Sequence, residues 1–259
     1  PPRSTLFPYT TLFRSRGRKT PSEIRSIKKA IAHTLEIFDV VTGALAPGKS
    51  EQDIARVILA EVERRGLALA WDRDHCPAVF TGPDHAGAHY GPTRRKIRPG
   101  HVLNIDFGVK VDGYCSDLQR TWYIRKKHEK DAPAEVTRGF AVIRDSIRLA
   151  ADALKPGVVS WKVDAVARAH ITANGYPEYP HALGHQVGRA AHDGGGGLLP
   201  RWERYGQLPF GKIEAGQVFT IEPRLPIEGY GVATVEEIVW VTDKGAQFLS
   251  RPQKELIVV

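Results

Sequence analysis

Helix-like and strand-like patterns of hydrophobic residues follow one another along this chain in the same order twice. Thr20, Pro21 and Glu23 form a capping box with proline in the first helical position, which predicts a helix extending to about residue 45. The apolar stripe that follows Ser50 predicts a second helix, which Gly66 ends. Runs typical of strands come next, at about residues 77–81, 101–110 and 119–125.

The same order of elements returns in the second part of the chain. Helices are predicted at about residues 134–154 and 160–174, and strands at about 217–224, 231–242 and 246–249. Residues 45–66 match residues 154–175 at an offset of 109 positions, and residues 96–108 match 212–224 at an offset of 116. This internal repeat predicts an α+β fold in which two pseudo-symmetric ααβ halves, about residues 20–130 and 131–259, pack together.

Acidic residues fall at matching positions of the two repeats. Asp106 follows the apolar run "VLNI", and Glu222 follows "VFTI" at the equivalent place. Asp117 and Glu236 form a second matching pair, displaced by a three-residue insertion. Acidic residues also recur in solvated hairpins, but a carboxylate at the end of a buried strand loses its hydration unless it is paired or bound to a metal. The pattern therefore favours a metal site where the halves meet.

Composition narrows the range of partners and compartments. Charged residues make up 25% of the chain, as in an ordinary soluble globular protein. No apolar run approaches the roughly 18–20 residues of a membrane helix, so we expect no membrane partner. Two cysteines provide no disulfide framework, which favours a reducing compartment and predicts a cytoplasmic protein.

The net charge of +8 is concentrated at the start of the chain. Residues 1–19 carry five positive charges and no acid, so the remainder has a net charge of only +3 and predicts no nucleic-acid partner. Residues 5–15, "TLFPYTTLFRS", resemble the translation of a short-read sequencing adapter; a signal peptide is the alternative, but Pro8 breaks its apolar part. We therefore expect residues 1–19 to be a non-native segment outside the fold.

The acidic pairs and their flanking residues resemble the pita-bread metallopeptidases, the M24 family that includes methionine aminopeptidase, aminopeptidase P and prolidase. The resemblance implies two divalent ions held by five residues: Asp106 and Asp117 in "NIDFGVKVDGYCSD", His185 in "HALGHQVG", Glu222 in "TIEP" and Glu236 in "TVEE". It further implies that Asp117 and Glu236 bridge both ions. Asp106 would complete the shell of one ion, and His185 and Glu222 that of the other.

This ligand set fits the chemistry of the family. Four carboxylates and one imidazole suit Mn²⁺ best, with Co²⁺, Fe²⁺ and Zn²⁺ as alternatives. Two ions can share a water and lower its pKa, which supplies a bridging hydroxide near neutral pH. The resemblance implies that Glu222 shuttles the proton of this water to the leaving nitrogen.

Three further histidines match positions of the family that lie near the substrate. The resemblance assigns His192 to the scissile carbonyl or to the tetrahedral intermediate. His89, in "AHYG", would lie near the amino end of the substrate, and His181 would line the substrate pocket. Four further histidines are expected to be structural or on the surface: His75, His85, His128 and His170.

Several local motifs favour the Xaa-Pro branch, whose members cleave Xaa-Pro peptides, over methionine aminopeptidase. These are "HALGH", "RKTPSEIRSIKKA" and "AHY", together with the short interval between Glu222 and Glu236. We therefore predict an aminopeptidase P or prolidase acting on small peptides, with methionine aminopeptidase as the enzymatic alternative. A pseudopeptidase binding module and a metal-free hydrolase such as creatinase are disfavoured because all five ligand positions are kept. Members of this branch usually carry an N-terminal domain, and a homodimer is left open.

Two features depart from the pattern of this branch. Thr234 stands where branch members commonly place an arginine, two residues before the last ligand. Residues 193–211 form a longer connection than usual, beginning with four glycines at 194–197. This connection is either a mobile lid, with Trp202 and Tyr205 available to line the pocket, or a disordered surface loop.

Overall fold

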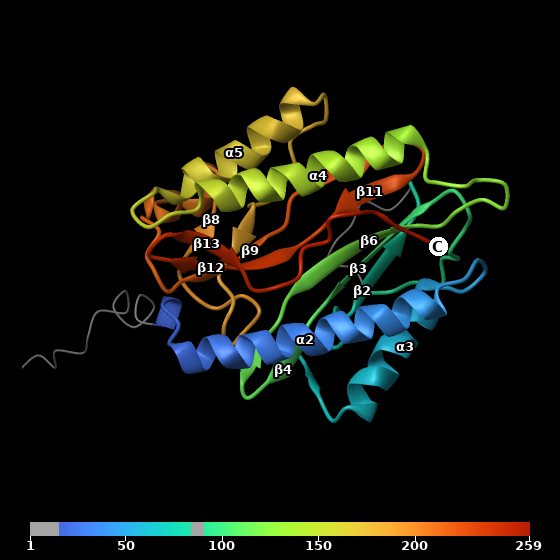
Figure 1. The fold of residues 1–259 in the computed structure, drawn as a ribbon, viewed down its shortest axis with the longest axis horizontal. Coiled ribbons are helices and arrows are strands. Elements are labelled where there is room, and N and C mark those ends of the chain that lie inside the picture. Colours follow the sequence, from blue (N-terminus) through green and yellow to red (C-terminus); the bar gives the residue numbers. More distant parts are fainter. Residues whose placement is uncertain (1–15, 84–90) are drawn as a thin grey trace, which may run out of the picture.

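The computed structural model describes residues 16–83 and 91–259. Strands occupy the middle of the molecule, with one pair of helices on each side (Figure 1). Helices α2 (Pro21–Ala44) and α3 (Glu51–Arg64) belong to the first repeat, and α4 (Ala134–Ala153) and α5 (Ser160–Ala173) to the second. The mixed fold of two ααβ repeats that the sequence predicts is confirmed.

The first two helices begin where the sequence predicts because both have complete capping boxes. The Thr20 hydroxyl accepts from the Glu23 amide at 3.4 Å, and the Glu23 carboxylate accepts from the Thr20 amide at 2.7 Å. Ser50 and Asp53 repeat the arrangement at the start of α3, with distances of 3.1 and 2.6 Å. These bonds satisfy amide groups that have no partner within the helix.

The strands form two larger sheets and several short ones. In the first sheet the strand order is β14-β6-β3-β2, and in the second it is β13-β12-β9. The elements of the first sheet are β2 (Ala78–Thr81), β3 (Val102–Phe107), β6 (Leu118–Tyr123) and β14 (Ile257–Val258). Those of the second are β9 (Val218–Ile221), β12 (Glu237–Thr242) and β13 (Gly245–Phe248).

The remaining strands are short and lie around the two sheets. A three-stranded sheet contains β1 (Ala68–Leu69), β4 (Val109–Val111) and β5 (Tyr114–Cys115), in the order β1-β4-β5. A hairpin joins β10 (Arg224–Ile227) to β11 (Gly231–Thr234). Two-residue strands β7 (Gly184–His185) and β8 (Gly197–Leu198) pair antiparallel, and two 3₁₀ helices follow, η1 (Glu203–Tyr205) and η2 (Leu208–Phe210).

Three predicted strands are interrupted in the structure. The run 101–110 divides into β3 and β4, the run 217–224 into β9 and β10, and the run 231–242 into β11 and β12. Glu222 and Glu236 lie in two of these breaks, and Asp106 is the last residue but one of β3. The predicted strands were too long because an apolar pattern does not reveal where the backbone leaves a ladder.

The repeat is visible as equivalent hydrogen bonds in the two halves. The Gly48 amide donates to the Ile97 carbonyl at 3.0 Å, and the Gly157 amide donates to the Ile213 carbonyl at 2.8 Å. The two donors, Gly48 and Gly157, are 109 positions apart, and the two acceptors, Ile97 and Ile213, are 116 positions apart, which are the offsets of the sequence repeat. An isolated antiparallel bridge between Gln119 of β6 and Glu236, which directly precedes β12, joins the strands of the two halves.

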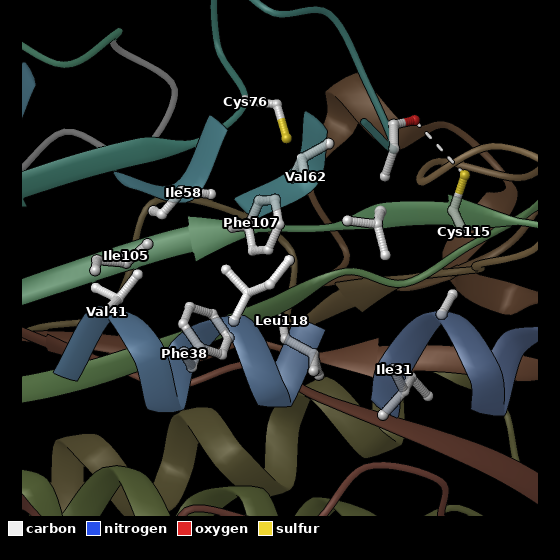
Figure 2. Close-up of a cluster of buried hydrophobic side chains, with 14 of the residues drawn as sticks. Ile31, Phe38, Val41, Ile58, Val62, Cys76, Ile105, Phe107, Cys115 and Leu118 are labelled. Carbon is white, nitrogen blue, oxygen red and sulfur yellow. Dashed lines mark hydrogen bonds between the residues drawn. The ribbon is translucent and has the colours of Figure 1, made fainter. Parts of the chain in front are cut away.

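Two hydrophobic clusters form the core, one on each side of the sheets. In the first, Phe38 of α2 packs edge-on against Phe107 (Figure 2), with ring centroids 6.0 Å apart. Phe38 also packs against Trp122, with ring centroids 5.7 Å apart. The second cluster lies between α4, α5 and the strands of the second repeat. Cys76 and Cys115 are both buried and unpaired.

Residues 16–19 belong to the fold, which corrects the expectation that all of 1–19 lies outside it. The Lys19 amide donates to the Gly216 carbonyl at 2.7 Å. The Lys19 ammonium lies 2.9 Å from the Asp193 carboxylate, and both side chains are only 1% exposed. The non-native origin of residues 1–19 stays a prediction, and residues 1–15 lie outside the described residues. No helix in the described part of the chain is long and apolar enough to cross a membrane.

Candidate metal centre

The four predicted carboxylate ligands lie at the ends of two antiparallel strand pairs. Asp106 lies near the end of β3 and Asp117 directly before its neighbour β6. Glu222 directly follows β9, and Glu236 directly precedes the neighbouring strand β12. His185 is the last residue of β7. The folding of the two repeats therefore brings acids that are far apart in sequence to the junction of the halves.

All five predicted ligands line one cavity of about 650 Å³. The His185 Nε2 atom lies 3.3 Å from a Glu222 oxygen, 3.7 Å from an Asp117 oxygen and 3.8 Å from a Glu236 oxygen. Ligand atoms of Asp117, His185 and Glu236 all lie within 4.8 Å of one another, close enough to share an ion. Asp106 adjoins this group through a side-chain hydrogen bond with Asp117.

Burial and mutual repulsion perturb the acidity of these side chains. Burial, reinforced by the neighbouring carboxylates, raises the pKa of Asp106 and of Glu236 well above its usual range. Burial raises the pKa of Asp117 to about 7, although the charge of His185 opposes the shift. Burial also acts to raise the pKa of Glu222, but its hydrogen bond with His185 prevails and lowers it.

Burial and the neighbouring carboxylates act in opposite directions on the pKa of His185. Burial alone would lower the pKa of His185, but its hydrogen bond and charge interaction with Glu222 and the charge of Asp117 raise it to about 9. The His185 Nδ1 atom lies 3.3 Å from the Gln186 carbonyl oxygen, which can only accept, so this nitrogen donates and Nε2 faces the carboxylates.

These residues fit a divalent metal. Asp106 Oδ1 and Glu236 Oε1 are buried and have no hydrogen-bond partner within residues 16–83 and 91–259. A buried carboxylate oxygen without a donor is costly unless a cation neutralises it. Oxygen ligands with a single imidazole suit manganese, cobalt or iron(II), and no thiolate that would select zinc lines the described part of the cavity.

The predicted substrate-side histidines are brought to the same cavity, apart from His89, which lies outside the described residues. The ring of His192 packs against that of His185, with centroids 3.9 Å apart at 45°. His181 lines the cavity, and its Nδ1 atom lies 2.8 Å from the Ala182 carbonyl oxygen.

Sequence reasoning missed other residues that line the cavity. His75, expected to be structural or on the surface, lines it together with Trp71. Arg224 and Thr234, which face each other across the β10–β11 hairpin, also line it. The sequence singles out Thr234 only because it stands where members of the Xaa-Pro branch commonly have an arginine, and nothing in the periodicity of residues 71–75 indicates a path toward the site.

The connection 193–211 is anchored near its start to β7 and α5. His185 pairs with Gly197 in the β7–β8 ladder, and the Ser160 hydroxyl bonds the Gly197 carbonyl and accepts from the Leu199 amide. A Cβ at Gly197 would lie 2.9 Å from the Gly184 carbonyl oxygen, so this glycine allows close approach of two backbones. Movement of the later part as a lid stays a prediction.

The two aromatic residues of this connection differ in their position. Tyr205 lines the cavity, as expected. Trp202 does not: it borders a second cavity, of about 510 Å³, beside α5. The prediction for Trp202 was wrong because its ring packs on arginine side chains of α5 and η1, which the sequence pattern does not show.

Two repeated ααβ halves with four carboxylates and a histidine at their junction define the pita-bread class of fold. The chain belongs to metallopeptidase family M24, whose profile matches residues 25–243. It is 30% identical over 248 residues to the Xaa-Pro dipeptidase of Lactobacillus helveticus, a match that covers 95% of this chain and 63% of that protein.

Solved structures show the same likeness. The X-Pro aminopeptidase from Thermotoga maritima MSB8 superposes with a TM-score of 0.85 and 26% identity over 96% of this chain and 67% of that chain. A prolidase from Thermococcus sibiricus gives a TM-score of 0.84 and 29% identity over 96% of this chain and 64% of that chain. The chain spans 62–64% of the length of several curated relatives that it matches.

Proposed function

We propose that this chain is the catalytic part of a dinuclear metal-dependent peptidase that hydrolyses Xaa-Pro peptide bonds in small peptides. The observation that carries the proposal is the gathering of five metal-ligand candidates and two further histidines around one cavity. The names of the relatives, which include Xaa-Pro dipeptidase and X-Pro aminopeptidase, support the substrate class.

The proposed metal site uses the side chains in distinct ways. Asp117 and Glu236 would hold both ions, Asp106 would hold one of them, and His185 with Glu222 would hold the other. Manganese is the proposed metal, since most of the ligand atoms are hard oxygens. When bound, the ions would polarise the peptide carbonyl and acidify a water at the site.

The chain's own groups supply proton transfer and substrate positioning. Glu222 is proposed to take a proton from the attacking water and pass it to the leaving nitrogen. His192, packed beside His185, is proposed to donate to the developing oxyanion of the scissile carbonyl. His181 forms part of the pocket wall, and His89 is proposed to contact the amino end of the substrate.

A comparison of peptides tests this function. Manganese-loaded protein should hydrolyse Xaa-Pro dipeptides or Xaa-Pro-Yaa tripeptides in preference to a Met-Ala-Ser peptide. Preference for the dipeptide would indicate prolidase specificity, and preference for the tripeptide aminopeptidase P specificity. Cleavage of Met-Ala-Ser alone would replace the proposal with the methionine aminopeptidase alternative. A protein that takes up no metal would instead be a pseudopeptidase.

The proposed setting of the enzyme is the cytoplasm. Two buried cysteines without a disulfide suit a reducing compartment. Fractionation of cells followed by immunodetection tests this location, and light scattering of the purified chain tests whether it forms a homodimer.

A further inference from the structure

A buried ion pair on α5 lies outside the candidate metal centre. The Arg168 guanidinium donates from Nε and Nη2 to the two oxygens of Asp164, at 2.9 Å in each case. The two side chains are 10% and 2% exposed. The residues are one helical turn apart, so the pair is formed within α5 and presents the remaining guanidinium hydrogens to the chain beside it.

These remaining donors bind the main chain of the segment that lines the cavity. Arg168 donates to the Tyr179 carbonyl at 2.8 Å and to the His181 carbonyl at 3.0 Å. Asp164 accepts at 3.1 Å from the Leu183 amide, which also donates to the Leu198 carbonyl at 2.9 Å. One ion pair therefore holds residues 179–183 at three points, and the middle of this segment (Pro180, His181 and Ala182) lines the candidate catalytic cavity.

Arg168 also contacts the opposite connection, residues 193–211. Its guanidinium packs over the Tyr179 ring at 4.0 Å and over the Trp202 ring at 4.9 Å. Trp202 in turn stacks on Tyr205, with centroids 6.0 Å apart at 16°, and Tyr205 lines the cavity. Arg168 therefore contacts both the segment 179–183 and the connection 193–211, which form two walls of the cavity.

The metal ligand nearest to this segment has separate supports. The His185 amide donates to the Thr220 hydroxyl at 3.1 Å, and His185 pairs with Gly197 in the β7–β8 ladder. Loss of Arg168 should consequently disturb the walls before it disturbs the position of His185.

We propose that Arg168 is a positioning residue that sets the two cavity walls formed by residues 180–182 and Tyr205, and thereby controls peptide binding without touching the peptide. This inference rests on the proposed function in one respect, because it takes the cavity as the peptide site. The fixed fork of the guanidinium is essential to it, since an ammonium cannot bond Asp164 with two parallel bonds and two carbonyls in the same plane.

The second cavity makes a chemical test possible. It is lined by Asp164, Arg168, Glu178 and Trp202 among others, so it reaches the place that the guanidinium occupies. In Arg168→Ala, free guanidinium ion added well below denaturing concentrations can enter from this side and bond the same acceptors. The matched control is Arg148→Ala, which removes an exposed arginine paired with Asp152 on the neighbouring helix.

Two measurements are made on wild type, Arg168→Ala, Arg168→Lys and Arg148→Ala. Hydrogen exchange of the segment 179–183 is followed in metal-free protein, and KM, kcat and metal content are determined for the manganese-loaded protein with an Xaa-Pro peptide. Arg168→Ala should exchange faster within the segment 179–183 and raise KM roughly tenfold, with a smaller change in kcat and unchanged metal content. Guanidinium should reverse both changes, Arg168→Lys should reverse neither fully, and Arg148→Ala should match wild type.

The outcomes separate positioning from a purely structural role. An unchanged KM in Arg168→Ala, or guanidinium that raises the melting temperature without lowering KM, would overturn the proposal. If Arg168→Ala does not fold, Arg168→Lys decides: a wild-type KM and wild-type exchange would contradict the need for the fork. A wild-type protein that hydrolyses no Xaa-Pro peptide overturns the proposed function instead, while the exchange experiment still decides whether Arg168 holds the segment.

Discussion

At the scale of single residues, the two adjacent histidine rings have different expected roles. His185 directs Nε2 at three carboxylates, whereas His192 packs on its ring and faces the same cavity. We predict that His192→Ala retains its metal but loses roughly 10²–10³ in kcat, as when a donor to a developing oxyanion is removed. His185→Ala should lose metal. Metal analysis and kinetics of both variants check this, and metal loss in His192→Ala would show that the division of roles is wrong.

The five ligand candidates could be predicted because each sequence signal was local or repeated. Asp106 and Glu222 follow apolar runs at equal offsets, and the resemblance to a family supplied the imidazole. His75 and Arg224 could not be found in this way. His75 lies in a non-repeated loop whose path depends on tertiary packing, and Arg224 belongs to a hairpin whose side chains reach the cavity only when the strand breaks after β9.

At the scale of secondary-structure elements, helices were more predictable than strands. Apolar stripes at 3.6-residue spacing, with capping boxes for α2 and α3, placed helices α2 to α5 to within two residues. The strand break next to Glu236 left no trace in the apolar pattern, because the flanking residues remain buried on both sides of the break. The break depends on the approach of the second half, which a local pattern does not contain.

The segment that precedes α2 gives a prediction about stability. Lys19 is buried against Asp193, so Lys19→Met should leave this buried carboxylate with the half-exposed Arg16 as its remaining ion pair among the described residues. Removing one member of a buried ion pair costs about 3–5 kcal/mol. The matched control is Arg18→Ala, since Arg18 is 55% exposed and lies 3.4 Å from Glu214. Urea unfolding of both variants measures the difference, and equal stability would mean that Lys19 contributes nothing to the fold.

The glycine-rich start of the connection 193–211 gives a second prediction about an element. Gly197→Ala would place a Cβ 2.9 Å from the Gly184 carbonyl oxygen and force β7 and β8 apart. Because β7 carries His185, we expect lower metal affinity as well as lower stability. Gly43→Ala is the control: its Cβ would meet no atom within 4 Å in α2, so it should stabilise by about 0.5–1 kcal/mol. Titration with manganese checks the first variant, and wild-type affinity would contradict a backbone role for Gly197.

At the scale of the whole molecule, the candidate metal centre lies where the two repeats join. Each half contributes two carboxylates, and the Glu236 amide donates across the junction to the Gln119 carbonyl at 3.0 Å. Packing alone brings the acids together against their repulsion, which is why burial and neighbouring charge raise the pKa of three of them. Bound cations would turn this repulsion into a link between the halves, so metal binding and stability should be coupled.

This coupling should depend on pH with a definite sign. Asp117 has a pKa of about 7 in the metal-free fold against 3.8 as its ordinary value, and the pKa values of Asp106 and Glu236 are also raised. A carboxyl whose pKa is raised on folding favours the fold most when it is protonated. Its contribution is therefore present below about pH 4 and is lost as the pH rises toward 7.

We accordingly predict that chelation lowers the melting temperature much more at pH 8 than at pH 5, and that manganese restores it. Asp117→Asn removes one of the repelling charges, so it should melt at a higher temperature than wild type when both are metal-free at pH 8, and manganese should raise it less. Scanning calorimetry with and without chelator at both pH values measures these effects. An equal loss on chelation at pH 5 and pH 8 would mean that the carboxylates are not the group that couples metal to stability.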